Sequence, residues 1–282
     1  MRVAIVYEIV RWEERELIKA ARAVGAYVEP VYVKSLPLYL NGASGGLDAD
    51  IALQRCISHY VALESSVAIE GLGVRVVNTV EATHRAMDKL WTISLLRSRG
   101  VPTPRTAVAF SPEAALEVAT EFGFPVVVKP VNGSWGRLVS IARDEEELRT
   151  IMEHRSYIPS MTSKVHLIQE YVRKPGRDIR VFVVGGEVVA AIYRVSNHWI
   201  TNTARGGRAV PARADPELEE VSVKAAEAVG GEVLGIDVFE DSGRGYLVNE
   251  VNPVPEFKNT VTATGVDIPR KIAEYLVREA AK

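Results

Sequence analysis

Two carboxylates and an amide near the end of the chain carry its clearest chemical signal. Asp237 lies in one strand-like segment, and Glu250 and Asn252 lie in the next, with turn residues centred on Gly243-Arg244 between them. This pattern predicts a β-hairpin. Counting outward from the turn places Asp237 opposite Glu250, with Cβ atoms about 5 Å apart. Asn252, two residues further on, faces the same side.

Such a pair of opposed carboxylates predicts a metal site. Like charges that face each other across a hairpin destabilise it, so a cation between them is the simplest explanation. Oxygen donors suit magnesium, or manganese, better than zinc. The alternative is a polar hairpin face in water, but the flanking apolar residues favour a buried hairpin and therefore the metal; they are Leu234, Ile236, Val238, Leu247, Val248 and Val251.

Composition bounds the class of protein. The 282 residues are 47% hydrophobic and 25% charged, which indicates a globular chain with a core divided over two or three lobes. A net charge of −2 argues against a general nucleic-acid binder. No stretch approaches the ~20 apolar residues of a membrane span, and no signal-peptide pattern is recognisable, so we expect a cytoplasmic protein.

Periodicity predicts an α/β chain. A strand–helix–strand opening lacks the glycine fingerprint of dinucleotide folds, and Gly100-Val101-Pro102-Thr103-Pro104 predicts a lobe boundary. The predicted strands are Val3–Tyr7, Tyr27–Val33, Ile51–Leu53, Val74–Asn78, Val126–Lys129, Leu138–Ala142, Leu167–Val172, Arg180–Val184, Val188–Tyr193, Val233–Phe239 and Tyr246–Asn252. The predicted helices are Glu13–Val24, His59–Leu72, Val80–Arg99, Pro112–Phe122, Glu145–Glu153, Pro216–Val229 and Ile268–Ala281.

A second polar set precedes the hairpin. Lys129 ends a strand and is followed by the glycine loop 132–137, a pattern that can direct backbone N–H groups and a positive charge at phosphates. Most glycine loops between strands merely turn the chain, so the loop alone is a weak signal. The segment 169–172 can offer backbone groups to an adenine edge or be an ordinary strand end. A basic stretch from Arg194 to Arg208 can bind carboxylates or phosphate.

Three other signals are excluded or given a structural interpretation. Gly42-Ala43-Ser44-Gly45-Gly46 matches the serine hydrolase elbow, but no helix start follows it. The five histidines lack metal-ligand spacing, so zinc is not supported. Cys56, the single cysteine, is interpreted as a small buried apolar residue.

The order of these features resembles the ATP-grasp ligases, specifically the RimK/LysX branch. It runs from a helical lysine (Lys89) and a strand lysine (Lys129) through a glycine loop, Gln-Glu-Tyr-Val, Asp-x-Arg and Asn-x-x-Arg-Gly-Gly to the hairpin triad. The resemblance implies an ATP-grasp fold with an N-terminal Rossmann-like pre-ATP-grasp lobe over residues 1–100. It implies an ATP-grasp region over 101–282, with a central lobe of about 101–170 and a C-terminal lobe of about 171–282.

The resemblance also implies roles residue by residue. Lys129, Arg194 and Arg205 are expected to act in catalysis. ATP would contact Lys89, Lys129, Gly133, Ser134, Trp135, Gly136, Arg137, Gln169, Glu170, Tyr171, Val172, Asp178 and Asn202. The amino-acid substrate would contact Arg194, Thr203, Glu256, Phe257, Lys258, Asn259 and Thr260. Asp237, Glu250 and Asn252 would bind magnesium.

The resemblance is greatest to the α-aminoadipate-specific members. These resemble the present chain at Asn259-Thr260, where the glutamate-specific members have Gly-Phe. The implied reaction joins the amine of α-aminoadipate to the C-terminal glutamate side chain of a small acidic LysW-like carrier through an acyl phosphate, in lysine biosynthesis. A basic rim of Arg177, Arg205, Arg208 and Arg213 would receive the carrier, and a homo-oligomer is expected.

Three alternatives remain open. One is a glutamate-specific or dual-specificity ligase serving arginine biosynthesis, because a single methylene, worth about 0.8 kcal/mol, separates the two amino acids. Another is a RimK-like ligase that adds glutamate to a peptide or protein. The last is a nucleotide-binding module without turnover, against which the complete carboxylate and amide triad argues.

Overall fold

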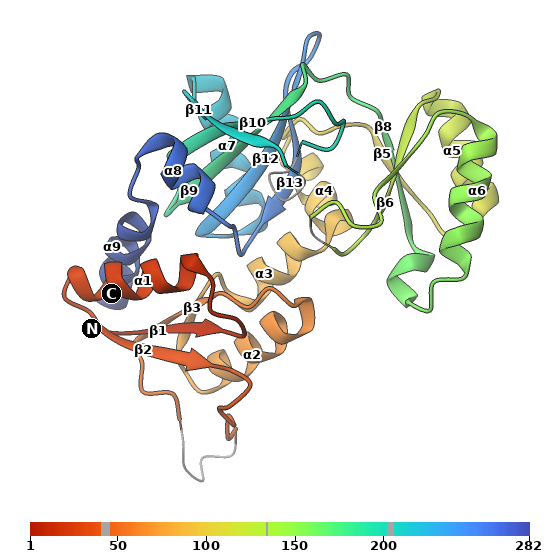
Figure 1. Ribbon diagram of the computed structural model, residues 1–282. Coiled ribbons are helices and arrows are strands. Elements are labelled where there is room, and N and C mark those ends of the chain that lie inside the picture. Colours follow the sequence, from red (N-terminus) through yellow and green to blue (C-terminus); the bar gives the residue numbers. More distant parts are fainter. Residues whose placement is uncertain (41–45, 134, 202–205) are drawn as a thin grey trace.

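The structure, a computed structural model, describes residues 1–40, 46–133, 135–201 and 206–282. Within these ranges the strands form three separate sheets, each at the centre of its own lobe (Figure 1). The predicted mixed α/β class is confirmed. In the described ranges no helix is long and apolar enough to cross a membrane.

The N-terminal lobe is built on a parallel sheet in the order β2-β1-β3-β4. Its central strand is buried from Val3 to Val6, as expected where helices cover both faces of a parallel sheet. The predicted strand–helix–strand opening is therefore confirmed. The elements are β1 (Arg2–Tyr7), α1 (Trp12–Ala23), β2 (Tyr27–Tyr32), β3 (Ile51–Gln54), α2 (His59–Gly71), β4 (Arg75–Val77), α3 (Val80–Met87) and α4 (Lys89–Ser98).

The predicted long helix over Val80–Arg99 is divided in two at Asp88. The backbone of Asp88 is extended, and its side chain accepts a 2.9 Å hydrogen bond from the N–H of Trp91, which caps the second helix. The break makes Lys89 the first residue of α4. The N–H of Lys89 donates to the carbonyl of Val131 at 2.8 Å, so the helix start is fixed beside the glycine loop.

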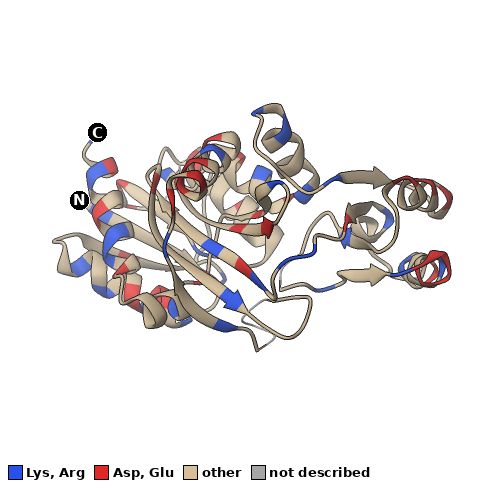
Figure 2. Cartoon of the chain, turned by 90° about the horizontal axis from the view of Figure 1, so that it is seen from above, with Lys and Arg blue, Asp and Glu red and all other residues tan. Residues whose placement is uncertain are grey.

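The central lobe is an antiparallel sheet in the order β5-β8-β6-β7, with α5 and α6 packed on it. Both helices begin at the predicted residues, where the side chains of Ser111 and Asp144 cap them by accepting backbone N–H groups of the first turn. Figure 2 shows acidic residues on these two helices, at the end remote from the other sheets. The elements are β5 (Thr106–Ala109), α5 (Pro112–Phe122), β6 (Val126–Pro130), β7 (Ser140–Ala142), α6 (Glu145–Ser156), a 3₁₀ turn (Met161–Lys164) and β8 (His166–Glu170).

The C-terminal lobe is an antiparallel sheet in the order β11-β10-β9-β12-β13. Helix α9 leaves this lobe and packs beside α1, where Ile272 and Leu276 share a core with Leu17 and with Phe182 of β9 (Figure 1). The first and last lobes are thereby joined. The elements are β9 (Arg177–Val184), β10 (Glu187–Val195), β11 (Arg208–Ala212), α7 (Pro216–Val229), β12 (Val233–Asp241), β13 (Gly245–Asn252), α8 (Lys258–Thr264) and α9 (Ile268–Ala280).

The hairpin of β12 and β13 pairs Asp237 with Glu250, as predicted, but by a different route. Asp241 pairs with Gly245, so the turn contains three residues rather than two. A bulge then leaves Asn249 without a partner in the register, and the shift of one residue restores the predicted pair. The bulge brings the consecutive side chains Asn249 and Glu250 to the same site.

Candidate active site

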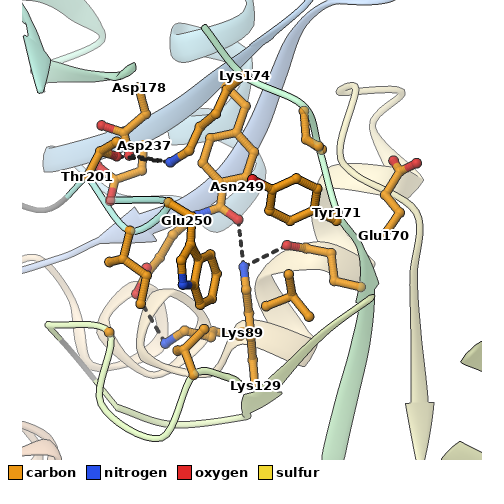
Figure 3. Close-up of a pocket in the computed structure, with 18 of the residues that line it drawn as sticks. Lys89, Lys129, Glu170, Tyr171, Lys174, Asp178, Thr201, Asp237, Asn249 and Glu250 are labelled. Atoms are coloured by element: carbon orange, nitrogen blue, oxygen red, sulfur yellow. Dashed lines mark hydrogen bonds and ion pairs between the residues drawn. The ribbon is translucent and has the colours of Figure 1, made fainter. Parts of the chain in front are cut away.

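A first hollow, with about 770 Å³ of space, lies between the central and C-terminal sheets (Figure 3). Its lining comes from the ends of β6, β8, β9, β10, β12 and β13, together with the glycine loop and the start of α4. The lining residues are Lys89, Val127, Lys129, Pro130, Gly133, Gly136, Arg137, Val139, Gln169, Glu170, Tyr171, Val172, Lys174, Asp178, Arg194, Trp199, Ile200, Thr201, Asp237, Phe239, Asn249 and Glu250.

Lys129 stands at the floor of the first hollow. Its Nζ donates to Oε1 of Gln169 at 2.6 Å and to Oδ1 of Asn249 at 2.7 Å (Figure 3). Burial lowers the pKa of this lysine to about 8, although the nearby Glu250 charge opposes the shift. The protonated amine of Lys129 is poorly hydrated and is held by neutral oxygens. A bound polyanion would therefore stabilise its positive charge.

Lys89 links the glycine loop to the hairpin. Its Nζ donates to the carbonyl of Gly133 at 2.6 Å and lies 3.1 Å from Oε1 of Glu250. The two lysines therefore approach the same space, one from α4 and one from β6. Together they can neutralise much of the charge of a bound triphosphate.

Three described residues of the glycine loop have positive φ angles. Gly133 and Gly136 have φ angles of 134° and 64°, and Trp135 also has a positive φ of 58°. The Arg137 guanidinium lies 4.6 Å from the centroid of the Trp135 ring. Gly136 and Arg137 line the first hollow and Trp135 lines a second one, while Gly133 borders both.

The segment that follows β8 lines the outer wall of the first hollow. Figure 3 shows the Tyr171 ring turned inward and the Glu170 carboxylate turned away. That carboxylate accepts from the N–H of Arg105 at 2.7 Å and pairs with Arg244 at 2.6 Å. Glu170 therefore uses its side chain to fix the strand end. Val172 is buried and adds apolar surface to the wall.

A buried network of charges forms the inner wall. Arg194 is 4% exposed and donates to both oxygens of Asp178, at 2.6 and 2.8 Å, and lies 3.1 Å from Asp237. Arg180 forms a two-pronged pair with Asp237. Burial alone would lower the pKa of Arg194, but the carboxylates of Asp237 and Asp178 hold it above its ordinary value. Asp178, which the resemblance assigns to ATP binding, lines the first hollow and is 2% exposed.

A second hollow, with about 1760 Å³ of space, opens on the other side of the hairpin. It lies between the N-terminal lobe and the segment that follows β13. Its lining residues are Arg11, Trp12, Glu13, Ile57, His59, Ala86, Met87, Gly133, Trp135, Arg180, Ile192, Arg194, Asp237, Glu250, Val251, Asn252, Pro253, Val254, Pro255, Glu256, Lys258, Asn259 and Thr260. The two hollows share Gly133, Arg194, Asp237 and Glu250.

The predicted substrate segment forms much of this second wall. Glu256, Lys258, Asn259 and Thr260 line the hollow, and Thr260 is 1% exposed. The Phe257 ring is fully buried in the core that joins the first and last lobes. The segment continues directly into α8, a helix that the sequence did not predict because its seven residues are too few for a periodic signal.

Comparison with known proteins identifies the family. The model of the RimK-like ATP-grasp domain matches residues 86–276, and that of the LysX preATP-grasp domain matches residues 3–84. The chain belongs to the RimK-like ATP-grasp family. It is an ATP-grasp carboxylate–amine ligase, with the N-terminal pre-ATP-grasp lobe that the sequence predicted.

Three relatives illustrate the similarity. The α-aminoadipate–LysW ligase LysX of Sulfurisphaera tokodaii is 44% identical over 99% of this chain and 98% of its own. The glutamate–LysW ligase ArgX of the same organism is 39% identical over the full length of both chains. A solved RimK domain ATP-grasp protein of Sphaerobacter thermophilus is 26% identical, with a TM-score of 0.82 over 98% of this chain and 100% of its own.

ATP-grasp ligases use ATP with magnesium, and the hairpin has fitting donors. Asp237, Glu250 and Asn252 all line the second hollow and all offer oxygen. The Asn252 amide donates through Nδ2 to the carbonyl of Gly235 at 3.3 Å, so its Oδ1 is the atom with ligand chemistry. Among the described residues no three His, Cys, Asp or Glu side chains gather as a metal site, so the amide would complete the set.

The structure corrects the expectation that a cation is needed to offset repulsion between Asp237 and Glu250. Repulsion between the two hairpin carboxylates is already offset by cationic side chains. Arg180 and Arg194 pair with Asp237, and Lys89 pairs with Glu250. Burial would raise the pKa of Asp237, but the two guanidinium groups hold it below its ordinary value. The donor chemistry of the hairpin, rather than its repulsion, supports the metal assignment.

The set predicted by resemblance assigned no role to Asn249, Arg180 or Lys174. Asn249 holds Lys129, Arg180 holds Asp237, and Lys174 donates to Oγ1 of Thr201 at 2.9 Å. Asn249 could have been recognised because the consecutive polar residues Asn249 and Glu250 break the alternation of a strand, which is a signature of a bulge. Arg180 belongs to the Asp-x-Arg motif but was given no role, and no local pattern distinguishes Lys174 from a surface charge.

Some predictions lie outside the described residues. These are Ser134, Asn202, Thr203, Arg205 and the start of the serine-elbow decoy, Gly42–Gly45. Of the predicted basic rim, Arg208 and Arg213 are exposed, and Arg177 pairs with Glu240 at 2.6 Å. Cys56 is fully buried, and burial raises the pKa of its thiol to about 12, which confirms its structural interpretation.

Proposed function

We propose that this ligase joins the amine of α-aminoadipate to the side-chain carboxylate of the C-terminal glutamate of a LysW-like carrier. The carboxylate oxygen attacks the γ-phosphorus of ATP, and ADP leaves. The amine then attacks the carbonyl carbon of the acyl phosphate, loses a proton and expels phosphate. The product is an amide that masks the amine during lysine biosynthesis.

The observation that carries this proposal is the junction of the two hollows. Both hollows are bordered by Gly133, Arg194, Asp237 and Glu250. A phosphoryl donor in the first hollow and an amine in the second would therefore meet at the same groups. An acyl-transfer site requires this geometry because the carboxylate must be phosphorylated and then attacked without diffusing away. A nucleotide-binding module without turnover has no need of the second hollow.

The residues that line the two hollows would have different roles. Lys129 and Lys89 would hold the phosphates, with the loop from Gly133 to Arg137 above them, and the wall formed by Tyr171 and Val172 would contact the adenine. Arg194 would stabilise the negative charge that develops on the acyl phosphate. Magnesium, held by the two hairpin carboxylates and the Asn252 amide, would offset phosphate charge.

The choice of amino acid is supported by sequence. Asn259-Thr260 is the pair that resembles the α-aminoadipate ligases, and identity is 44% to one of these ligases against 39% to a glutamate ligase. A glutamate-specific or dual-specificity LysW ligase is the alternative within the same mechanism. A ligase that adds glutamate to another peptide or protein is the alternative for the carboxylate substrate.

Mass spectrometry of the intact carrier is the direct test. The carrier would be incubated with the enzyme, magnesium, ATP and either α-aminoadipate or glutamate. We expect a mass increase equal to the amino acid minus water, larger in yield with α-aminoadipate. When the side-chain carboxylate of the C-terminal glutamate contains oxygen-18, one label should appear in the released phosphate. Formation of AMP and pyrophosphate would contradict the acyl phosphate.

A further inference from the structure

The short helix α8 is held at its start by a residue of the N-terminal lobe. Glu13, in the first turn of α1, accepts hydrogen bonds through Oε1 from the N–H of Phe257 at 3.2 Å and from the N–H of Lys258 at 3.1 Å. Glu13 is 5% exposed, so these bonds form away from water. Phe257 occupies the N-cap position of α8 and makes no side-chain cap of its own. The N–H groups of Phe257 and Lys258 are therefore satisfied from a distant part of the sequence.

A second contact fixes the residue that precedes this turn. Arg55, at 2% exposed, donates from Nη2 to the carbonyl of Pro255 at 3.1 Å, and its guanidinium lies 5.6 Å from the Phe257 ring. The same guanidinium is held by Glu14, whose Oε1 lies 3.2 Å from its Nε. We call Glu13, Glu14 and Arg55 the clamp, because they fix the backbone from Pro255 to Lys258.

The clamp ends immediately before Asn259-Thr260. Glu13 itself lines the second hollow together with these two residues. Two amino acids that differ by one methylene can be distinguished only if the pocket wall keeps a fixed depth, since the difference in chain length is about 1.3 Å. A seven-residue helix with an unsatisfied first turn would not keep such a depth unaided.

We propose that Glu13 is a positioning residue that sets the amino-acid selectivity of the ligase by fixing the start of α8. The inference rests on the proposed function, because it assumes that the second hollow receives the amino acid. It adds that selectivity depends on the docking of the N-terminal lobe as well as on Asn259 and Thr260. Glu13 contacts the backbone of α8 and has no part in ATP binding.

The test compares three variants of the full-length enzyme with the carrier present. Glu13→Ala removes the carboxylate that accepts the two hydrogen bonds. Glu13→Gln keeps a side chain of the same length with an amide oxygen that can accept them. Glu70→Ala is the matched control, because Oε1 of Glu70 also accepts a backbone N–H, that of Val80 at 2.9 Å, and neither residue lines the second hollow. For each variant, kcat/KM is measured with α-aminoadipate and with glutamate, together with the KM for ATP and the Tm.

We expect Glu13→Ala to raise the KM for the amino acid about tenfold and to move the selectivity ratio at least about fivefold towards unity. The KM for ATP should change less than about twofold. Glu13→Gln should stay within about threefold of the wild type, and Glu70→Ala should lower the Tm with an unchanged ratio. A fall in Tm for Glu13→Ala with an unchanged ratio overturns the inference.

Amide hydrogen exchange separates this inference from the proposed function. Glu13→Ala should accelerate exchange at Phe257 and Lys258 whatever reaction the enzyme catalyses. If the wild type ligates neither amino acid but Glu13→Ala still accelerates exchange, the proposed function and the selectivity role are both wrong. The clamp is then still supported. Unchanged exchange at both residues overturns the clamp itself.

Discussion

ATP binding should weaken as pH rises through about 8, because Lys129 loses its proton there. Burial places the pKa of this amine at about 8 in the free enzyme. Contact with phosphates would favour the charged form and raise that pKa in the complex. ATP therefore binds the protonated enzyme, and the observed affinity should follow the protonated fraction of Lys129.

The expected magnitude follows from that pKa. The protonated fraction is about nine-tenths at pH 7, about one half at pH 8 and about one-tenth at pH 9. Affinity should accordingly fall about tenfold between pH 7 and pH 9, which corresponds to about 1.4 kcal/mol. At pH 8, binding should take up about half a proton from the buffer.

Isothermal titration calorimetry in buffers of different ionisation enthalpy measures both quantities. The wild type would be titrated with ATP in excess magnesium at pH 7, 8 and 9. Lys129→Arg is the control, because a guanidinium keeps its charge throughout this range. We expect the variant to show neither the fall in affinity nor the proton uptake. If wild type and variant follow the same pH dependence, Lys129 does not titrate against the phosphates and the reasoning is refuted.

Two further predictions concern the hairpin and the amino-acid pair. Glu250→Gln should reduce ligation at least about 100-fold with an unchanged circular dichroism spectrum, because the amide keeps the shape of the side chain and removes the charge that would hold magnesium beside Asp237; near-normal turnover would contradict the metal assignment. Replacing Asn259-Thr260 by Gly-Phe should move the ratio of kcat/KM for α-aminoadipate and glutamate about tenfold towards glutamate, since the larger ring shortens the pocket. An equal loss for both amino acids, accompanied by a lower Tm, would mean that the buried Thr260 is structural.

Counting residues outward from the turn predicted the hairpin only in part. The pairing of Asp237 with Glu250 is correct, but the turn contains one more residue than the count assumed, and the bulge at Asn249 compensates for it. Alternation of apolar residues predicts strands well, and it does not specify where an extra residue is accommodated. The amide that holds Lys129 was missed for this reason.

Short elements at sheet edges were also missed. The strands β5 and β11 lie at the edges of their sheets, and only one side of each is paired. Residues of β11 are exposed or half-buried, so the sequence shows no buried run there. Tertiary pairing, rather than local propensity, makes these segments strands.

The sequence by itself determined the helices with strong caps, the α/β class and the residue types of the site. Helix capping by Ser111 and Asp144 depends on neighbours within a few residues, and so do the charged residues at strand ends. Such neighbours can be read from the sequence. Only the tertiary structure decided which charges meet. Arg180 and Arg194 contact Asp237 across 57 and 43 residues of chain, respectively. Glu13 contacts the start of α8 across about 244 residues. Partners so far apart are set by how the sheets pack, because the cost of burying a charge is repaid only where folding brings its counterpart within hydrogen-bonding distance.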